Sequence, residues 1–299
     1  MVKQDPLEIS QLARLQEVLE QSSVPAHHLR DLEGIRKVLS GERIEGTEEV
    51  RVLLRERSRP IRDRIRVGVD TELARSMSRY VLLMPEIYGP KPMPLDDVPF
   101  ADWLARVDLS WLGASRLTVV ESRIPAGVCS RDGHIAYVSD QLGALKPNDR
   151  GVLLGAGLEL ARRGLDVLTR MSLGSLQATL EAQAVAAGLV PVREVSERSK
   201  RLADRLPFQI RGRLNESEIR SLLAELYGEC GELMKALDKS RQAALILGGL
   251  YSGGVSLSAQ AISSLRDRRE QALCINVDAD LSMLVRWAVG PLYREVWTE

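Results

Sequence analysis

Five prolines between Met84 and Pro99 constrain the fold of this chain more than any other feature. The segment MPEIYGPKPMPLDDVP carries them at positions 85, 90, 92, 94 and 99. Because proline lacks a backbone N–H and clashes with the preceding helical turn, no helix can run through this segment. The sequence therefore predicts a helical module over residues 1–84, a proline-rich linker over residues 85–100 and a second domain over residues 101–299.

Before the prolines, apolar residues recur at intervals of three and four. Such patterns run from Ile9 to Leu19, from Leu29 to Leu39, from Thr47 onward and from Ile61 to about Leu83. This spacing places the apolar side chains on one face of a helix. We expect antiparallel helices here, without a fixed-period repeat.

After the prolines, two short segments are dense in β-branched residues. They are RLTVVES, residues 116–122, and HIAYVS, residues 134–139, and both are expected to be strands. The rest of the chain is expected to be helical, over residues 147–163, 173–187, 194–206, 216–237, 240–251, 256–266 and 279–297. The predicted fold class is therefore α+β, mostly helical, with a small sheet.

Composition narrows the classes of function. The chain has 299 residues, with 41 Lys and Arg against 41 Asp and Glu, and only 4% of its residues are aromatic. A net charge of zero gives no general attraction to nucleic acid, and few aromatic side chains are available for base stacking. The polar start of the sequence does not resemble a signal peptide, and no uncharged stretch is long enough to span a membrane. We expect a cytoplasmic protein without a cofactor.

One stretch in the second domain has a characteristic order of elements. LTVVESRIPAGVCSRDGHIAYVSDQLGALKPNDRGVLLGAGLELARRG reads as a strand, an irregular apolar loop, a second strand, a short turn and a long helix. Residues 116–164 thereby resemble the HtpX-like and CAAX-prenyl-protease-like zinc metallopeptidases. The resemblance implies a bacterial-type protein with a zincin-like domain, in which the long helix carries the H-E-x-x-H motif.

The residues at the motif differ from those that the chemistry needs. Two histidines at i and i+4 bind zinc from one helix face, and the glutamate between them activates the bound water. Here Leu158, Glu159 and Arg162 occupy these three places. An aliphatic side chain has no lone pair and a guanidinium is permanently cationic, so neither replaces a histidine. Only the glutamate is retained.

The resemblance also implies a third ligand, a glutamate on a later helix. The most similar stretch is ALDKSRQAALIL, which puts Ala236 at the ligand position and Ser240 at the position of a supporting aspartate. With this alignment all three metal ligands are missing. A shift of register would bring Glu232 or Asp238 near the position, although one carboxylate alone would not hold zinc.

Glu159 also has an interpretation that needs no relationship to peptidases. It precedes Arg162 by three residues and Arg163 by four, the order that stabilises a surface helix by about 0.2 to 0.5 kcal/mol. In the degenerate-peptidase interpretation, we expect Arg162 to neutralise Glu159 and to help hold an inactive cleft together.

An arginine-rich run precedes the linker. RVLLRERSRPIRDRIR contains seven arginines against Glu56 and Asp63, and could contact an anion, a partner or a nucleic acid. Solvated helix faces with neighbouring acids explain such runs more often, and one exposed patch would favour nucleic acid. The arginines are Arg51, Arg55, Arg57, Arg59, Arg62, Arg64 and Arg66.

Two loops are similar to ligand-binding motifs. LYSGGVSLS has two glycines before an expected helix, but it lacks the G-K-[ST] ending of a phosphate loop, so we interpret it as a helix break with a restart at Ser256. NVDADLS contains Asp278 and Asp280, which we interpret as part of the cap of the last helix. A calcium loop would need more oxygen ligands.

These observations predict a catalytically inactive metallopeptidase-like protein that acts as a scaffold, adaptor or regulatory subunit. Its partner would be another protein or a second copy of the chain. One alternative is a hydrolase that pairs Glu159 with Glu232 or Asp238 as acid and base. A third option is nucleic-acid binding through the arginine-rich run.

Overall fold

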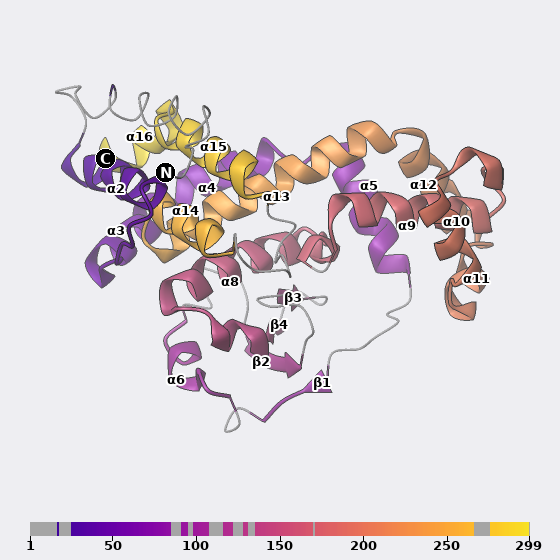
Figure 1. Ribbon diagram of the computed structural model, residues 1–299, viewed down its shortest axis with the longest axis horizontal. Coiled ribbons are helices and arrows are strands. Elements are labelled where there is room, and N and C mark those ends of the chain that lie inside the picture. Colours follow the sequence, from indigo (N-terminus) through magenta and orange to yellow (C-terminus); the bar gives the residue numbers. More distant parts are fainter. Residues whose placement is uncertain are drawn as a thin grey trace, which may run out of the picture.

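The structure is a computed structural model that describes residues 17, 25–84, 91–94, 98–107, 116–121, 128–130, 135–169, 171–265 and 276–298. Within these residues the protein is mostly helical, with 14 α-helices and a small sheet. The sheet lies below the central helices in Figure 1. The prediction of a mostly helical chain with few strands is confirmed. The helical pattern from Ile9 to Leu19 falls almost entirely outside the described residues.

Four helices precede the proline-rich segment. Two of them begin at a threonine whose hydroxyl accepts a backbone N–H three residues later: Thr47 from Val50 at 3.4 Å and Thr71 from Ala74 at 3.2 Å. Because Thr71 starts a new helix, the predicted pattern from Ile61 to Leu83 is two helices rather than one. The four are α2 (Ala26–Leu39), α3 (Glu48–Arg57), α4 (Arg59–Val67) and α5 (Glu72–Leu83).

The sheet contains the two predicted strands and two others. Its order is β1-β2-β4-β3, with β2 and β4 parallel and the two outer pairs antiparallel. The unpredicted strands are β3, expected to be an irregular loop, and β1, within the proline-rich segment. Pro92 is tolerated because β1 lies at the edge of the sheet. The strands are β1 (Lys91–Pro92), β2 (Arg116–Glu121), β3 (Val128–Ser130) and β4 (Ile135–Ser139).

The remaining helices follow the sheet or flank it. The α-helices are α6 (Ala101–Leu104), α8 (Pro147–Arg162), α9 (Leu173–Ala186), α10 (Glu197–Asp204), α11 (Phe208–Arg213), α12 (Ser217–Gly228), α13 (Cys230–Ser252), α14 (Val255–Ser264), α15 (Val277–Ala288) and α16 (Pro291–Thr298). Short 3-10 turns are η2 (Asp140–Ala144), η3 (Asp166–Thr169) and η4 (Val192–Glu194).

Helix α13 differs most from the sequence prediction. Helices were expected over 216–237 and 240–251, but the chain breaks at Glu229 and then continues through residue 240 to Ser252. The polar stretch around Arg241 is compatible with the core because its guanidinium pairs with buried Asp280, with two N–O distances of 2.6 Å. The expected helix 279–297 is likewise two helices, separated at Gly290.

Helices α8 and α13 lie side by side at the centre of the molecule (Figure 1). Their backbones approach closely at two glycines: a Cβ on Gly248 would lie 2.3 Å from the carbonyl oxygen of Val152, and one on Gly155 would lie 3.1 Å from the Cα of Gly248. All residues of α8 from Gly151 to Ala161 are buried. The interpretation of Glu159 as part of a surface helix is therefore wrong, although its pairing with Arg163 four residues later is present.

The helices before the proline-rich segment pack on the helices that end the chain. Helix α2 contacts α14, and α3 and α5 contact α13. Buried residues from both sides of the segment, such as Leu32 and Trp297, belong to one hydrophobic cluster. The division into a module and a second domain stays a prediction.

A buried carboxylate joins α2 to the start of α14. Asp31 accepts the backbone N–H of Val255 at 3.0 Å and that of Ser256 at 3.1 Å, together with the hydroxyls of Ser256 and Tyr293. Gly254, at φ +150°, fits against this carboxylate because a Cβ there would lie 2.3 Å from an Asp31 oxygen. The interpretation of the glycine loop as a helix break and restart is confirmed, with the restart at Val255.

Candidate functional site

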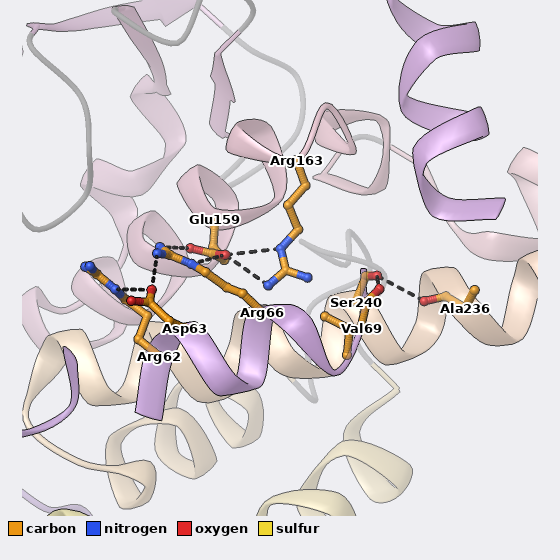
Figure 2. Close-up of polar contacts among 8 residues, drawn as sticks. All are labelled: Arg62, Asp63, Arg66, Val69, Glu159, Arg163, Ala236 and Ser240. Carbon is orange, nitrogen blue, oxygen red and sulfur yellow. Dashed lines mark hydrogen bonds and ion pairs between the residues drawn. The ribbon is translucent and has the colours of Figure 1, made fainter. Parts of the chain in front are cut away.

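Glu159 lies near the C-terminal end of α8, and its carboxylate is 6% exposed. Two guanidinium groups bind it, as Figure 2 shows. Arg66 of α4 donates from Nε to Oε1 at 2.8 Å and from Nη2 to Oε2 at 2.6 Å. Arg163 donates from Nε and Nη2 to Oε1 at 3.1 and 3.0 Å. The acid that sequence reasoning singled out is therefore the centre of a partly buried ion-pair cluster.

The electrostatics of this cluster favour the ionised form of Glu159. Burial raises the pKa of the carboxyl, but the hydrogen bonds and charge of Arg66, followed by the charges of Arg163 and Arg162, outweigh burial and hold the pKa below its usual value. The expectation that Arg162 neutralises Glu159 is only partly met, because Arg162 contributes the smallest of these attractions. Arg66 contributes the largest; the sequence identified it only as one of the seven arginines that could contact an anion or partner, not as the partner of Glu159.

The cluster forms one wall of a cavity of about 500 Å³ between α4, α5, α8 and α13. Arg162 and Ser240 line this cavity together with Glu159, so three of the five positions implied by the peptidase resemblance meet there. Leu158 and Ala236 do not line it. Both are buried, at 4% and 7% exposure, and Leu158 belongs to the hydrophobic core.

The charged lining of the cavity is mainly cationic. Five arginines face two acids, and the exposed side chains of Val67 and Leu82 add an apolar part. Two of these arginines have acidic partners: Arg75 pairs with Asp70 at 3.4 Å, and Arg79 pairs with an acid of α12 that does not line the cavity. The charged residues are Arg66, Arg75, Arg79, Arg162, Arg163, Asp70 and Glu159.

The residues at the implied metal site do not suit zinc. Ser240 points along its own helix and donates its hydroxyl to the carbonyl oxygen of Ala236 at 3.0 Å (Figure 2). Leu158 and Ala236 offer no side-chain lone pair, and Glu159 already accepts four N–H donors. Among the described residues no group of three or more His, Cys, Asp or Glu side chains could hold a metal ion.

The carboxylates proposed as partners of Glu159 lie elsewhere. Glu232 is paired with Lys235 at 2.7 Å on the exposed part of α13, and Asp238 is paired with Arg241 at 2.7 Å. Neither lines the cavity beside Glu159. The structure therefore does not bring together the acid and base that the hydrolase alternative requires.

The seven arginines of residues 51–66 are distributed over different surroundings. Arg51 and Arg55 line a second cavity, whereas Arg66 binds Glu159 in the first. Arg62 lies 3.7 Å from the carboxylate of Asp63, and Arg64 pairs with an acid of α16. Arg57 and Arg59 line neither of these two cavities. This distribution differs from the single exposed patch that would favour nucleic acid.

One charged pair in the core was not foreseen. Arg241 and Asp280 are 2% and 0% exposed, and Asp280 also accepts the backbone N–H of Asn276. Asn276 caps α15 through Ala279, so the interpretation of this loop as a helix cap is confirmed. The sequence signal was an arginine close before the apolar stretch AALILGGL of α13, since a guanidinium drawn into the core requires a buried partner.

The fold is mostly helical with a small mixed sheet. The site is a glutamate bound by two arginines, at a cavity between α4, α5, α8 and α13. Comparison with known proteins finds no matching family model, no matching curated protein and no matching solved structure. Within the described residues no single helix meets the length and apolarity of a membrane span; α13 and α14 meet them only as a pair, bent by 114°.

Proposed function

We propose that this protein is a cytoplasmic, zincin-like protein without a metal site, which acts as a scaffold, adaptor or regulatory subunit by binding another protein. The observation that carries the proposal is the double guanidinium clamp on Glu159 by Arg66 and Arg163. In the alignment with zinc peptidases, Glu159 takes the place of the catalytic base, and the clamp occupies both of its carboxylate oxygens. The residues at the other aligned positions are not metal ligands.

The arrangement of the elements supports the zincin-like part of the proposal. A parallel strand pair, β2 and β4, precedes α8, and α8 packs against α13, which carries the aligned third-ligand position. Glu159 and Ser240 consequently face the same cavity from two helices. This arrangement of elements without metal ligands is expected of a protein that kept the cleft of a peptidase but lost its catalytic activity.

The clamp also disfavours general-base catalysis by Glu159. A general base needs an accessible oxygen within hydrogen-bond reach of the proton that it removes. Both oxygens of Glu159 already accept guanidinium N–H groups, and the lowered pKa of the carboxyl reduces its affinity for a proton. Glu159 therefore serves the structure and the charge balance of the cavity.

The lining of the cavity indicates what the protein binds. Excess arginine attracts carboxylates, and Val67 and Leu82, which are 77% and 56% exposed, offer apolar contact beside them. An acidic segment of a partner protein that carries an apolar side chain is complementary to both. We take this segment as the occupant of the cavity.

Site-specific cross-linking in cells that express the full chain tests this proposal. A photoreactive amino acid at Leu82 should form an adduct with one discrete protein, and the same group at the exposed Val192, remote from the cavity, should not. Replacing Arg79 and Arg162 by Glu should abolish the adduct. The proposal is contradicted if the adduct still forms after this charge reversal. It is also contradicted if the photoreactive group at position 82 forms no adduct. An adduct between two copies would identify the chain itself as the partner.

A further inference from the structure

A second cavity, of about 790 Å³, lies at the start of α8, whereas the cavity of Glu159 lies at its end. It is bounded by α3, α6, the start of α8 and the end of α13. Its size falls in the range of cavities that enclose small organic ligands, roughly 300 to 1,000 Å³. Nothing in the proposed protein-binding function uses it.

The start of α8 supplies backbone donors to this cavity. The 16-residue helix begins at Pro147 without a side-chain cap among the described residues, and Pro147 and Asn148 both line the cavity. The first amide to bond within the helix is that of Arg150, to the carbonyl oxygen of Lys146 at 3.0 Å. The amides before it therefore have no partner in the helix. The positive end of the helix dipole also lies at this cavity, and these two features together favour binding of an anion.

Ser252, the last residue of α13, provides an independent indication of a ligand. Its side chain is 3% exposed and lines the cavity, yet its hydroxyl has no hydrogen-bond partner among the described residues. The hydroxyl oxygen lies beside α8, because a Cβ on Gly151 would be 2.7 Å from it. A buried hydroxyl without a partner is costly, so a ligand that accepts its proton would stabilise this arrangement.

Three arginines surround these donors. Arg51 donates from Nε to the carbonyl oxygen of Ser252 at 3.1 Å, and Arg55 donates to that of Tyr251 at 3.2 Å while its guanidinium lies 4.4 Å from the Tyr251 ring centre. These contacts fix both groups at the wall. Arg106, on the exposed segment after α6, faces them across the cavity.

Two acids share the lining with the three arginines, so one positive charge remains in excess. Glu48 is paired with Arg51 at 2.6 Å and is 67% exposed, and Asp102 is exposed at the mouth. The indole of Trp103 lines the same cavity and gives an apolar, planar surface. A ligand with one anionic group and one flat apolar part matches this lining.

We infer that this cavity binds a small organic phosphate, with the phosphate group held by the start of α8, the Ser252 hydroxyl and the arginines, and the organic part against Trp103. Phosphate has enough acceptor oxygens to use amide, hydroxyl and guanidinium donors at once. A mononucleotide is the simplest compound that carries both parts.

Calorimetric titration of the full chain at low ionic strength tests the inference with AMP, inorganic phosphate and adenosine. We expect saturable 1:1 binding of AMP, weaker binding of inorganic phosphate and no binding of adenosine. Ser252→Ala and Arg106→Gln should each weaken AMP binding about tenfold, which corresponds to about 1.4 kcal/mol. The exposed Arg193→Gln removes the same charge far from the cavity and should leave the affinity unchanged.

Ser252→Ala has a second readout that separates binding from folding. Because the hydroxyl has no partner, its removal should leave the melting temperature of the free protein unchanged or higher while AMP affinity falls. The inference is overturned if AMP and phosphate fail to bind at about 10 mM, a concentration above the Kd of even weak complexes. Adenosine binding as tightly as AMP, or affinities unaffected by both variants, would also overturn it.

Discussion

Two buried carboxylates, Glu159 and Asp31, are stabilised by opposite means. Both line cavities, but Glu159 is held by the charged guanidinium groups of two arginines, whereas Asp31 is held by two backbone amides and two hydroxyls. Arginine charge lowers the pKa of Glu159 despite its burial, while burial raises the pKa of Asp31 despite four hydrogen-bond donors. Neutral donors thus satisfy a carboxylate without compensating for its lost hydration.

The contrast separates a structural role from a binding role. Asp31 accepts hydrogen bonds from the first amides of α14 and from the hydroxyl of Tyr293 on α16, so it fixes how α2, α14 and α16 meet. Glu159 balances arginines that also line the cavity that we propose to be the binding site. Four predictions follow from this contrast.

Asp31→Ala should have the largest effect. It leaves the amide of Ser256 and the hydroxyl of Tyr293 without the acceptor that they use, and leaves the amide of Val255 only the Tyr293 oxygen at 3.4 Å; each unsatisfied buried donor costs about 1 to 3 kcal/mol. We expect the free energy of unfolding to fall by about 3 to 5 kcal/mol, measured in urea. The exposed Glu194→Ala should change it by less than about 0.5 kcal/mol. A loss for Asp31→Ala as small as that of the control would contradict the capping role.

Glu159→Gln should have the second largest effect. It keeps the shape of the side chain but removes the carboxylate from two guanidinium groups: Arg163, 14% exposed, loses its countercharge, and Arg66, 20% exposed, keeps only the exposed Asp63 at 3.2 Å. We expect a loss of about 2 to 3 kcal/mol, less than for a fully buried pair because the cavity admits solvent. The matched control is Glu218→Gln, which breaks the exposed pair with Arg79 and should cost at most about 0.5 kcal/mol. Equal losses in the two variants would show that the clamp is an ordinary surface contact.

Arg163→Gln and Arg162→Gln compare two adjacent residues of the same type. Arg163 donates two hydrogen bonds to Glu159, so its replacement should cost about 1 to 2 kcal/mol. Burial and the charge of Arg66 lower the pKa of Arg162, so removing its charge relieves repulsion and should cost no more than about 0.5 kcal/mol. Chemical denaturation of both variants measures the difference. The reverse order would restore Arg162 as the principal partner.

The pH dependence of stability should differ in sign between the two acids. The lowered pKa of Glu159 means that its ion pairs stabilise the fold above the unfolded pKa of about 4.3, and this contribution is lost as pH falls through the folded pKa. The raised pKa of Asp31 means that its ionised form costs stability at neutral pH, and this cost disappears as pH falls through its folded pKa towards about 3.9.

Unfolding of the wild type, Glu159→Gln and Asp31→Asn between neutral and acidic pH measures these contributions. The deficit of Glu159→Gln relative to the wild type should shrink on acidification, and that of Asp31→Asn should grow. Parallel curves for the two variants would contradict the contrast.

Sequence reasoning identified the parts of the fold that depend on local signals. The proline at position 147 and the glycine at 164 bound the pattern of α8, and β-branched density marks β2 and β4. It also singled out Glu159, because the spacing of a motif is local. The resemblance placed Ser240 near Glu159 across two helices, and the structure brings both to one cavity.

Contacts between residues far apart in the sequence could not be predicted from local sequence patterns. Arg66 lies 93 positions before Glu159, and Arg241 lies 39 positions before Asp280. A helix was therefore expected to begin at Ser240, although α13 runs through this polar stretch, where Arg241 has the buried partner Asp280. The unpaired hydroxyl of Ser252 has no sequence signal, since its burial depends on α8 meeting α13 at Gly151.

The zinc content of the purified full chain tests the central claim most directly. The protein would be expressed in zinc-supplemented medium, dialysed without chelator and measured by inductively coupled plasma mass spectrometry beside Glu159→Gln. Because the aligned positions 158, 162, 236 and 240 offer no pair of zinc ligands, we predict far less than one zinc atom per chain for both proteins. One zinc atom per wild-type chain that is lost in Glu159→Gln would contradict the claim that the metal site is gone.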